Sequence, residues 1–462
     1  MKLISTYSVV YKLRGAALGL AVLLSADSMR AGTIEDWWEG KYATGNWFGV
    51  RDTLVEHGVT FSGEWKANSL WDVDGGLQQR YGFDEEIKFR ALVDIAKLTG
   101  WEALDGLTAF SDVRWRDGDG VNKWVGASGT FGPSTFQSGK QWRFQNAYLS
   151  YTTPELFGIK KFLTISGGWQ NPADIFIKQP ESKFFVNNTF TSARGISANA
   201  IPWGGSYSAW GGYLQVKPVD WYYAQGGLYL AIPYGNNTRN HGLDFSGYQI
   251  DPGLNGLYAL AETGVTPALG PSKLPGRYAA GFIYWGVENT SFKGADYDGR
   301  YLLYWQADQM VFREATAESP ALPGKGPSDG EATGKAVAPS KPKLSDQGLS
   351  LFSLVNFAPK YNNALPFYFQ TGLLYRGLIP GRDADQTGLA FAYGNYSFYK
   401  QQADEQRGRP VQSYEAVLEL DYRFQINKWA YIQPTLQYLI RPNGTGLTAN
   451  ATVLGFQTGI TF

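Results

Sequence analysis

The sequence predicts an all-β fold, a transmembrane antiparallel β-barrel of about 16 strands, preceded by a short N-terminal helical segment. Three observations support this fold class. Amphipathic segments of roughly 10 to 14 residues follow one another, which suits strands that cross a bilayer better than shorter globular strands. The composition combines 56 Gly, 16 Trp, 29 Tyr and 27 Phe with only 18% charged residues, which favours strands and turns over helices. The last amphipathic segment ends on an aromatic residue, Phe462.

Residues 1–31 have the outline of a secretory signal peptide. Basic side chains precede an apolar run at 16–24, and small residues follow it. Cleavage after Ser28 and cleavage after Ala31 both fit. The alternative is a single membrane anchor, but the apolar run is too short to span about 30 Å of hydrocarbon.

Residues 32–57 are expected to form an N-terminal periplasmic segment ahead of the barrel. Phe48, Leu54 and Val55 have helical spacing, and Gly58 is a stop signal. A short periplasmic helix, a helix that plugs the lumen and a structured lead-in without a role all fit this pattern.

The barrel itself is predicted over 58–462. An even number of strands places both ends of the barrel on one side of the membrane, and the connections alternate between short turns and long loops, the longest at 118–140, 177–207 and 234–253. The predicted strands are 58–75, 86–98, 107–117, 141–153, 163–176, 208–218, 219–233, 254–266, 278–290, 301–313, 348–358, 367–379, 387–398, 412–426, 429–441 and 449–462.

One segment does not fit the strand pattern. Residues 315–347 are rich in Pro, Ala, Gly, Lys and Ser and almost lack large apolar side chains, so they cannot bury enough surface to fold alone. The strand count places this insertion on the periplasmic side. We expect a disordered insertion; a tether to peptidoglycan or to a partner, and an error in the strand count, are the alternatives.

The segment EAVLELDYRF at 415–424 shows what the barrel interpretation implies. Its apolar side chains share one face and its charged side chains share the other. In a soluble sandwich the apolar face is buried and the charged face is solvated. In a barrel the apolar face meets outer-membrane lipid, because a charge there costs about 2–4 kcal/mol, and the charged face lines the lumen. Long strands in this number favour the barrel, and a barrel of this size leaves an aqueous channel.

The charged face therefore supplies the candidate residues that line the pore. Both signs of charge are present, whereas a pore for simple ions more often shows a ring of one sign. Mixed guanidinium and carboxylate groups suit a neutral polyhydroxyl solute, since each group bridges neighbouring hydroxyls. The candidates are Glu64, Lys66, Arg90, Asp94, Asp112, Arg114, Arg116, Arg143, Glu415, Glu419, Asp421 and Arg423.

The composition argues against several other functions. There is no cysteine, and the two histidines are His57 and His241, so thiolate chemistry is excluded and histidine-based metal or catalytic sites are poorly supplied. Lys+Arg 41 balance Asp+Glu 41, which gives no indication of nucleic-acid binding. Glu419 and Asp421 could be read as the carboxylate pair of a glycosidase, but both belong to a row of similar groups and nothing singles them out. We expect no catalysis, no metal and no cofactor.

Three stretches resemble the carbohydrate-selective porins of the OprB type. These are TGNWFGVRDTLVEHGVTFSGEW at 44–65, PFYFQTGLLYRGLIPGRDADQTGLAFAYG at 366–394, and YEAVLELDYRFQINKWAYIQPTLQYLIRPNG at 414–444, the last leading to a terminal GFQTGITF. The resemblance covers the chain after the leader, apart from 315–347.

The resemblance implies a passive sixteen-stranded porin of the bacterial outer membrane that admits glucose and related sugars. Inward-folded loops with Arg and acidic residues would narrow it. Independently of the resemblance, an aromatic residue at the end of an amphipathic last strand is the signal that the outer-membrane assembly machinery reads, so we expect recognition through Phe462. Where the family pattern suggests an arginine, this chain has Trp169. A porin for organic acids, aromatics or amino acids, and a purely structural barrel, stay as alternatives, as do a monomer and a homo-oligomer.

Overall fold

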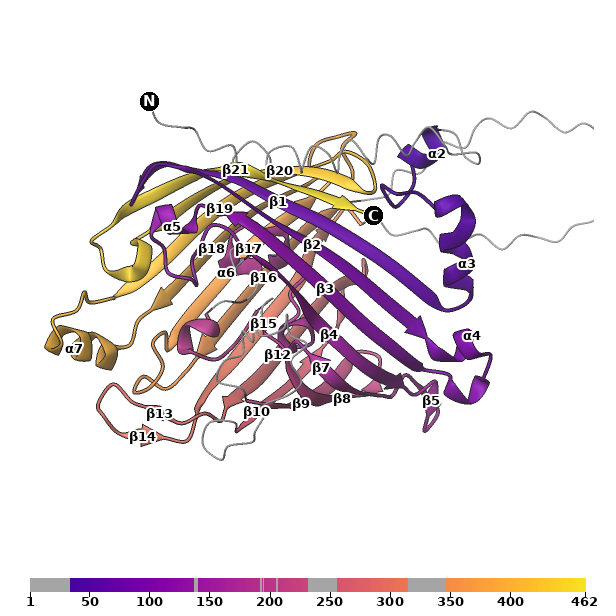
Figure 1. Cartoon of the computed structure of the whole chain (residues 1–462), viewed down its shortest axis with the longest axis horizontal. Coiled ribbons are helices and arrows are strands. Elements are labelled where there is room, and N and C mark those ends of the chain that lie inside the picture. The colour runs from indigo at the N-terminus through magenta and orange to yellow at the C-terminus, as the bar shows by residue number, and fades with distance from the viewer. Residues whose placement is uncertain are drawn as a thin grey trace, which may run out of the picture.

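A computed structural model describes residues 34–462 except 137–139, 192, 194, 205–206, 232–255 and 315–345. Sixteen long antiparallel strands form a barrel that closes where β1 pairs with β21, as the amphipathic pattern predicts (Figure 1). The strands are β1 Val59–Gly76, β2 Tyr81–Asp94, β3 Leu107–Asp119, β4 Gln141–Thr152, β7 Leu163–Gln170, β8 Ala209–Val219, β9 Tyr222–Leu230, β10 Leu257–Val265, β12 Leu274–Trp285, β15 Arg300–Arg313, β16 Gly348–Phe357, β17 Phe367–Arg376, β18 Gln386–Asn395, β19 Tyr414–Gln425, β20 Ala430–Ile440 and β21 Ala449–Thr461.

The two ends of the barrel differ in their connections. We call the end that carries Phe462 and the short turns the turn end, and the opposite end the loop end (Figure 1). At the turn end lie α2 Ile34–Trp38, α3 Val50–Glu56, α4 Ile95–Thr99, β5 Glu155–Leu156, β6 Ile159–Lys160 and β11 Ala268–Leu269, and at the loop end lie α5 Asn122–Val125, β13 Asn289–Thr290, β14 Asp296–Tyr297 and α7 Phe398–Gln406.

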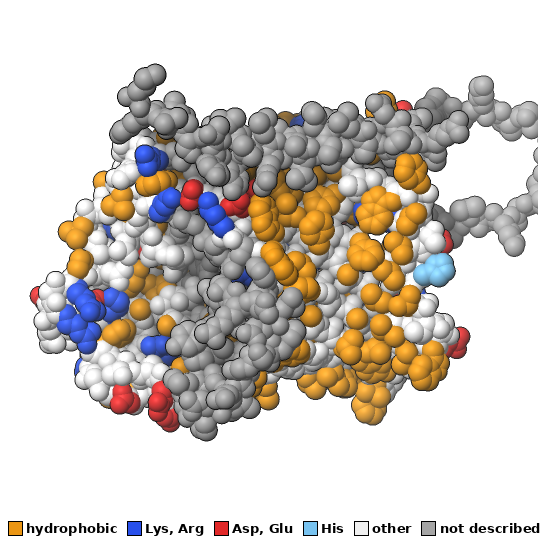
Figure 2. All heavy atoms as spheres, in the orientation of Figure 1, with side chains coloured by type: hydrophobic (Ala, Val, Ile, Leu, Met, Phe, Trp, Pro, Cys, Tyr) orange, Lys and Arg blue, Asp and Glu red, His pale blue; other side chains and the backbone are white. Residues whose placement is uncertain are grey.

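The wall of the barrel has an apolar outside and a polar inside. In β19, Leu418 and Leu420 are 42% and 48% exposed, whereas Glu419 between them is 0% exposed. Figure 2 shows apolar side chains over the outer wall toward the turn end, while charged side chains gather at the loop end. The barrel is therefore inverted relative to a soluble protein, because its outer face must meet hydrocarbon.

The hydrophobic core lies inside the barrel. Much of it comes from the loop between β7 and β8, residues 171–208, which we call the inward loop, and the loop between β3 and β4 adds Val121, Val125 and Phe131. The inward loop contains η4 Pro172–Asp174, η5 Ser182–Phe184, α6 Asn188–Thr191 and η6 Ser197–Asn199. Its apolar side chains pack against inward-facing aromatics of the wall, for example Phe185 against Phe352 with ring centroids 5.7 Å apart. The inward loop thus fills part of the lumen.

The N-terminal segment packs against the turn end and not within the lumen. Trp37 and Trp38 surround Trp429, with ring centroids 5.0 and 6.0 Å away. The backbone N–H of Ala43 donates to the carbonyl of Thr461 over 2.8 Å. Helix α3 confirms the predicted helical segment, and Gly58 follows it with φ +84°, a conformation that favours glycine.

Within the described ranges, no helix has both the length and the apolar composition needed to span a bilayer. The predicted leader at 1–31, the loop at 234–253 and nearly all of the insertion at 315–347 lie outside the described residues.

Candidate functional site

A cavity of about 320 Å³ lies in the lumen between the inner face of β1–β3 and the inward loop. Its wall side is charged, and its loop side combines apolar and polar side chains. The residues that line it are Glu64, Lys66, Glu86, Lys88, Arg90, Arg114, Arg116, Thr135, Phe136, Ala173, Asp174, Ile177, Gln179, Ser182, Lys183, Phe185, Phe190, Thr191, Ala193, Trp203, Gly204 and Gln457. We call this the first cavity.

A chain of ion pairs covers the wall side of the first cavity. The strand register places Glu64 opposite Lys88, and Glu86 opposite Arg116. Lys66 lies 2.7 Å from Glu64, Lys88 lies 2.8 Å from Glu86 and 3.8 Å from Glu64, and Arg116 lies 2.5 Å from Glu86. Because Glu64 and Glu86 each lie between cations on the same and the neighbouring strands, these two carboxylates hold the head groups of Lys66, Lys88 and Arg116 in place.

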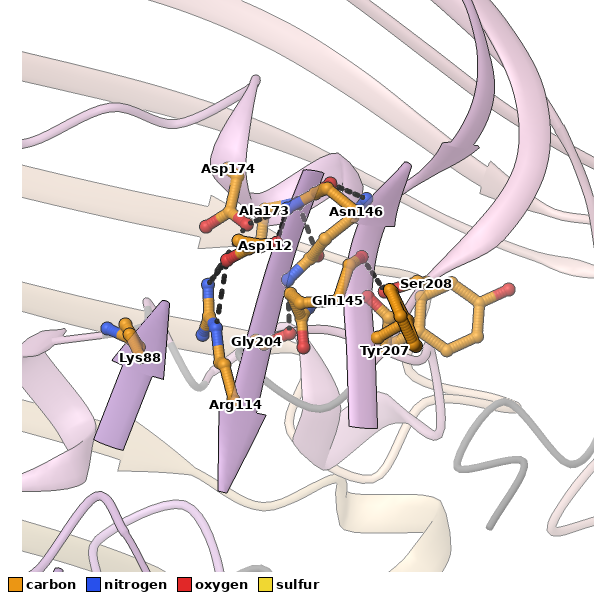
Figure 3. A network of polar contacts seen from close by, with 12 residues as sticks. Lys88, Asp112, Arg114, Gln145, Asn146, Ala173, Asp174, Gly204, Tyr207 and Ser208 are labelled. Carbon is orange, nitrogen blue, oxygen red and sulfur yellow. Dashed lines mark hydrogen bonds and ion pairs between the residues drawn. The ribbon is translucent and has the colours of Figure 1, made fainter. Parts of the chain in front are cut away.

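Arg114 joins this wall to the inward loop. Its guanidinium lies 3.3 Å from Asp112 on the same strand and 3.2 Å from Asp174 on η4. Asn146 on β4 donates to both carboxylates, over 2.8 and 3.0 Å. Figure 3 shows the side chains of Arg114 and Asn146 converging on the two carboxylates from adjacent strands. The arrangement fixes Arg114 and the start of the inward loop together.

The opposite side of the first cavity is aromatic. Phe185, Phe190 and Trp203 come from the inward loop, and Phe136 comes from the loop between β3 and β4. Phe185 and Phe190 contact each other with ring centroids 5.2 Å apart. The cavity therefore offers flat apolar surface on one side and fixed donors and acceptors on the other.

Glu419 anchors the inward loop to the far wall. Its carboxylate accepts hydrogen bonds from the backbone N–H groups of Val186, over 2.8 Å, and Asn187, over 3.0 Å. Thr435 and Gln437 on β20 donate to the same oxygen over 3.2 and 3.4 Å. A buried carboxylate with this many donors is well satisfied, and its role here is to hold backbone.

Two further wall residues bind loop backbone in the same way. Glu262 on β10 accepts from the backbone N–H of Ile177 over 3.1 Å and pairs with Arg277 at 2.9 Å. The side-chain oxygen of Asn146 accepts from the backbone N–H of Asn171 over 2.8 Å. The inward loop is thus tied to β4, β10 and β19 around the circumference.

Of the other charged residues of β19, Glu415 and Arg423 also contact loops, and Asp421 contacts the neighbouring strand β20. Glu415 accepts backbone N–H groups of Ser128 and Asn443, over 3.1 and 2.8 Å. Asp421 accepts from Gln433 over 2.8 Å, and Arg423 donates to Gln433 over 2.6 Å and to the carbonyl of Phe184 over 3.3 Å. In the charged row of EAVLELDYRF, Glu415, Glu419 and Arg423 thus hold loops, Asp421 is bonded to the neighbouring strand, and none of the four lines the first cavity.

Comparison with known proteins identifies this architecture. The model of the family described as carbohydrate-selective porin, OprB family, matches residues 83–462. The chain belongs to the OprB family. It is accordingly a channel of the bacterial outer membrane and not an enzyme.

Individual relatives agree with this assignment. The chain is similar to Porin B of Pseudomonas aeruginosa, with 26% identity and 91% of each chain covered, and to the putative porin QuiX of Acinetobacter baylyi, with 20% identity and 92% and 95% covered. Among solved structures, OprB of Pseudomonas putida at high pH matches with a TM-score of 0.76 and 20% identity over 92% of this chain and 99% of that one. Its low-pH structure matches with a TM-score of 0.55 and 18% identity over the same shares.

The OprB-family structure divides the sequence-predicted residues into groups. Five of the twelve line the first cavity: Glu64, Lys66, Arg90, Arg114 and Arg116. Asp112 stands behind Arg114, and Arg143 faces Arg114 across the β3–β4 ladder. On β19, Glu415, Glu419 and Arg423 hold loops, and Asp421 accepts from Gln433 on β20. Asp94 lies away from the cavity, where its carboxylate caps α4 by accepting the N–H of Lys97 over 3.1 Å.

Several cavity residues are absent from the sequence-based set. Glu86 and Lys88 share the inward phase of Arg90, so the alternation of β2 could have found them. Asp174 and Lys183 lie on the inward loop, where no periodicity indicates direction. Trp169, the departure from the family pattern, does not line the cavity; it packs edge-to-face on Trp210 with centroids 5.9 Å apart.

Proposed function

We propose that the chain admits glucose and related sugars by passive diffusion and that the first cavity is the constriction of the pore. The proposal rests on one observation: across the cavity, the ion-paired side chains of β1–β3 face four aromatic side chains, Phe136, Phe185, Phe190 and Trp203. Sugar hydroxyls both donate and accept, so alternating guanidinium, ammonium and carboxylate groups satisfy them in pairs. The C–H faces of the sugar ring fit aromatic surface.

The size of the cavity agrees with this solute class. A volume of about 320 Å³ is at the lower end of the roughly 300–1,000 Å³ of ligand pockets, which suits a monosaccharide better than an oligosaccharide. Most head groups on the wall are already paired with one another, as in Lys66–Glu64, Lys88–Glu86 and Arg116–Glu86. A neutral solute can therefore replace water at these groups without breaking an ion pair.

A second candidate solute class is supported by the charge count. The lining includes six cations, Lys66, Lys88, Arg90, Arg114, Arg116 and Lys183, against three carboxylates, Glu64, Glu86 and Asp174. An excess of cations favours small organic acids over amines. A pore for organic acids, including sugar acids, is therefore the alternative to a pore for neutral sugars.

The arrangement of the chain in the membrane follows from the same proposal. The turn end would face the periplasm, with 1–31 removed as a signal peptide, 32–57 lying beside the barrel and 315–347 projecting from a turn. Phe462, which the assembly machinery would recognise, closes the seam: its carbonyl accepts the N–H of Gly63 over 2.6 Å.

Liposome swelling tests the proposal. Vesicles with refolded protein are diluted into glucose, a disaccharide, gluconate or glycine at equal osmolarity. We expect glucose to enter faster than the disaccharide and faster than glycine. If gluconate enters faster than glucose, the organic-acid alternative is correct; if glucose is no faster than glycine, the sugar proposal fails.

Substitution at the constriction provides the residue-level test. Arg114→Ala and Arg116→Ala remove head groups from the cavity wall, so we expect both variants to pass the disaccharide faster while glucose selectivity falls. Arg407→Ala, at the exposed end of α7, is the matched control with no change expected. Unaltered disaccharide entry in both folded variants would contradict the assignment of the constriction.

A further inference from the structure

A second cavity, of about 580 Å³, lies in the lumen nearer the turn end. It is lined by the inner faces of β12 and β15–β18 and by the inward loop, and the paired residues Arg313, Gly348, Arg376 and Gln386 mark its level on the wall. These residues lie at the ends of their strands, next to the turns.

One segment of the inward loop separates the two cavities. Ile177, Gln179, Ser182 and Lys183 line the first cavity, whereas Lys178, Pro180 and Glu181 line the second. The separating segment is held by its backbone: the N–H of Ile177 donates to Glu262, and the carbonyl of Lys178 accepts from Arg277 over 2.6 Å. A solute that leaves the first cavity toward the turn end therefore has the second cavity as its neighbour.

The second cavity contains a buried carboxylate without a donor. Asp308 on β15 is 5% exposed, and neither of its oxygens has a hydrogen-bond partner among the described residues. The carboxyl group of Glu181 and the amide of Gln179 both lie against Asp308. The amide nitrogen of Gln179 donates to the carbonyl of Ser353 over 2.8 Å, and one oxygen of Glu181 is also buried without a partner. Asp308 and Glu181 thus form a pair of adjacent carboxyl groups with few donors. Such acceptors are costly to leave unsatisfied and therefore indicate a donor that is supplied from outside the chain.

Donors and apolar surface complete the second cavity. The guanidinium of Arg277 is fixed by Glu262 at 2.9 Å, and that of Arg313 by the carbonyl of Ser272 at 2.7 Å. For the head groups of Lys178 and Arg376, both exposed, the described residues provide no ion pair or hydrogen bond. Pro180, Pro275, Met310 and Leu374 add apolar lining. The second cavity thus repeats the chemistry of the first: carboxylates, cationic donors and apolar surface.

We propose that the second cavity is a binding subsite for a polyhydroxyl solute, in series with the first cavity, in which Asp308 accepts hydroxyl protons and Arg376 donates to hydroxyl oxygens. The proposal rests on the proposed function, since it assigns the same sugar to a second position on its path. Two subsites in series let a second sugar bind before the first has left, which is the arrangement that combines binding with release in selective channels.

Site-directed thiol labelling tests this subsite. The chain has no cysteine, so a single introduced thiol reports one position. Ser350→Cys reports the second cavity and Thr191→Cys reports the first. Thr99→Cys, exposed on α4 at the turn end, is the control outside both. The rate of modification by a small methanethiosulfonate is measured on the refolded barrel against increasing glucose.

Bound sugar should slow labelling by a factor of 1 + [glucose]/Kd, about elevenfold when glucose is at ten times its dissociation constant. We expect this protection at Ser350→Cys and at Thr191→Cys, and none at Thr99→Cys. When Asp308→Asn or Arg376→Gln is combined with Ser350→Cys, the protection of the thiol by glucose should be abolished or reduced severalfold. The same substitutions combined with Thr191→Cys should leave the protection unchanged. If Asp308→Asn does not fold, Arg376→Gln, whose side chain is exposed, carries the test.

Each remaining outcome decides a different point. Protection at Thr191→Cys with none at Ser350→Cys would overturn the second subsite and leave the proposed function standing. Absence of protection at both positions would overturn the proposed function. Protection at Ser350→Cys that survives both substitutions unchanged would refute the assignment of Asp308 and Arg376.

Discussion

Replacement of Glu419 by alanine should release one segment of the inward loop and widen the pore. Glu419 is fully buried and accepts the backbone N–H groups of Val186 and Asn187. The alanine variant leaves both donors without an acceptor. The anchor at Glu262 binds Ile177, nearer the start of the loop, and is unchanged, so the release should stay local to the region around 184–188.

The size of the effect follows from the two backbone N–H donors, of Val186 and Asn187, that lose their acceptor. An unsatisfied buried donor costs about 1–3 kcal/mol, so two donors destabilise the docked segment by about 2–6 kcal/mol. At about 1.4 kcal/mol per factor of ten, the equilibrium between docked and released loop shifts by about 1.4 to 4.3 powers of ten. Glu419→Gln keeps one acceptor oxygen, and its effect should be smaller.

Single-channel recording in planar bilayers measures this shift. Glu419→Ala should raise the mean conductance and add slow current fluctuations, and it should let a disaccharide into liposomes. Glu405→Ala, at an exposed position on α7, is the matched control. A folded Glu419→Ala barrel with wild-type conductance, low current noise and wild-type disaccharide exclusion would refute the anchoring role.

Three further predictions concern assembly, acid stability and the insertion. A Cβ on Gly63 would lie 2.2 Å from the ring of Phe462, so Gly63→Val should lower the temperature at which the folded gel band is lost; an unchanged temperature would contradict this seam. Burial alone would raise the pKa of Asp385, but the bidentate hydrogen bonds of Arg382, with two further donors, hold it below 3.8. The contribution of Asp385 to the free energy of unfolding is therefore complete above about pH 4, and it is lost as the pH falls through the lower pKa of the folded state. Asp385→Asn should flatten the acid side of the plot of unfolding free energy, measured with urea, against pH. An unaltered plot would show that the pairing with Arg382 is weak. Deletion of 315–347 should leave glucose swelling unchanged, and a failure to assemble would show that the insertion is structural.

The strands could be predicted because lipid imposes the pattern locally. Each strand must turn apolar residues outward, so alternation alone locates it. The ends were less accurate where turn chemistry intervenes. The prediction of a strand over 163–176 was too long: β7 ends at Gln170, because Asn171 caps the next turn by accepting the N–H of Ala173 over 3.0 Å and Pro172 lacks a donor for the ladder.

The site could be predicted only in part. The alternation of a strand shows which side chains point into the barrel, but it does not show what those side chains contact there. Arg114 and Glu419 both point inward, but the first borders a cavity and the second borders the inward loop. The difference depends on the path of the inward loop, residues 171–208. A loop of irregular backbone carries no periodic signal from which that path could be predicted. For the same reason Asp174 and Lys183 could not be placed.

The wall holds the inward loop through the backbone groups of the loop. The residues that support the loop are therefore different from the loop side chains that face the solute. Glu419 binds the amides of Val186 and Asn187, Glu262 binds that of Ile177, and Arg423 binds a carbonyl. Any residue except proline supplies such an amide. Side chains that face the solute are therefore free to vary during evolution without weakening the attachment of the loop to the wall. A barrel with these anchors can change its solute specificity by exchanging a few loop residues.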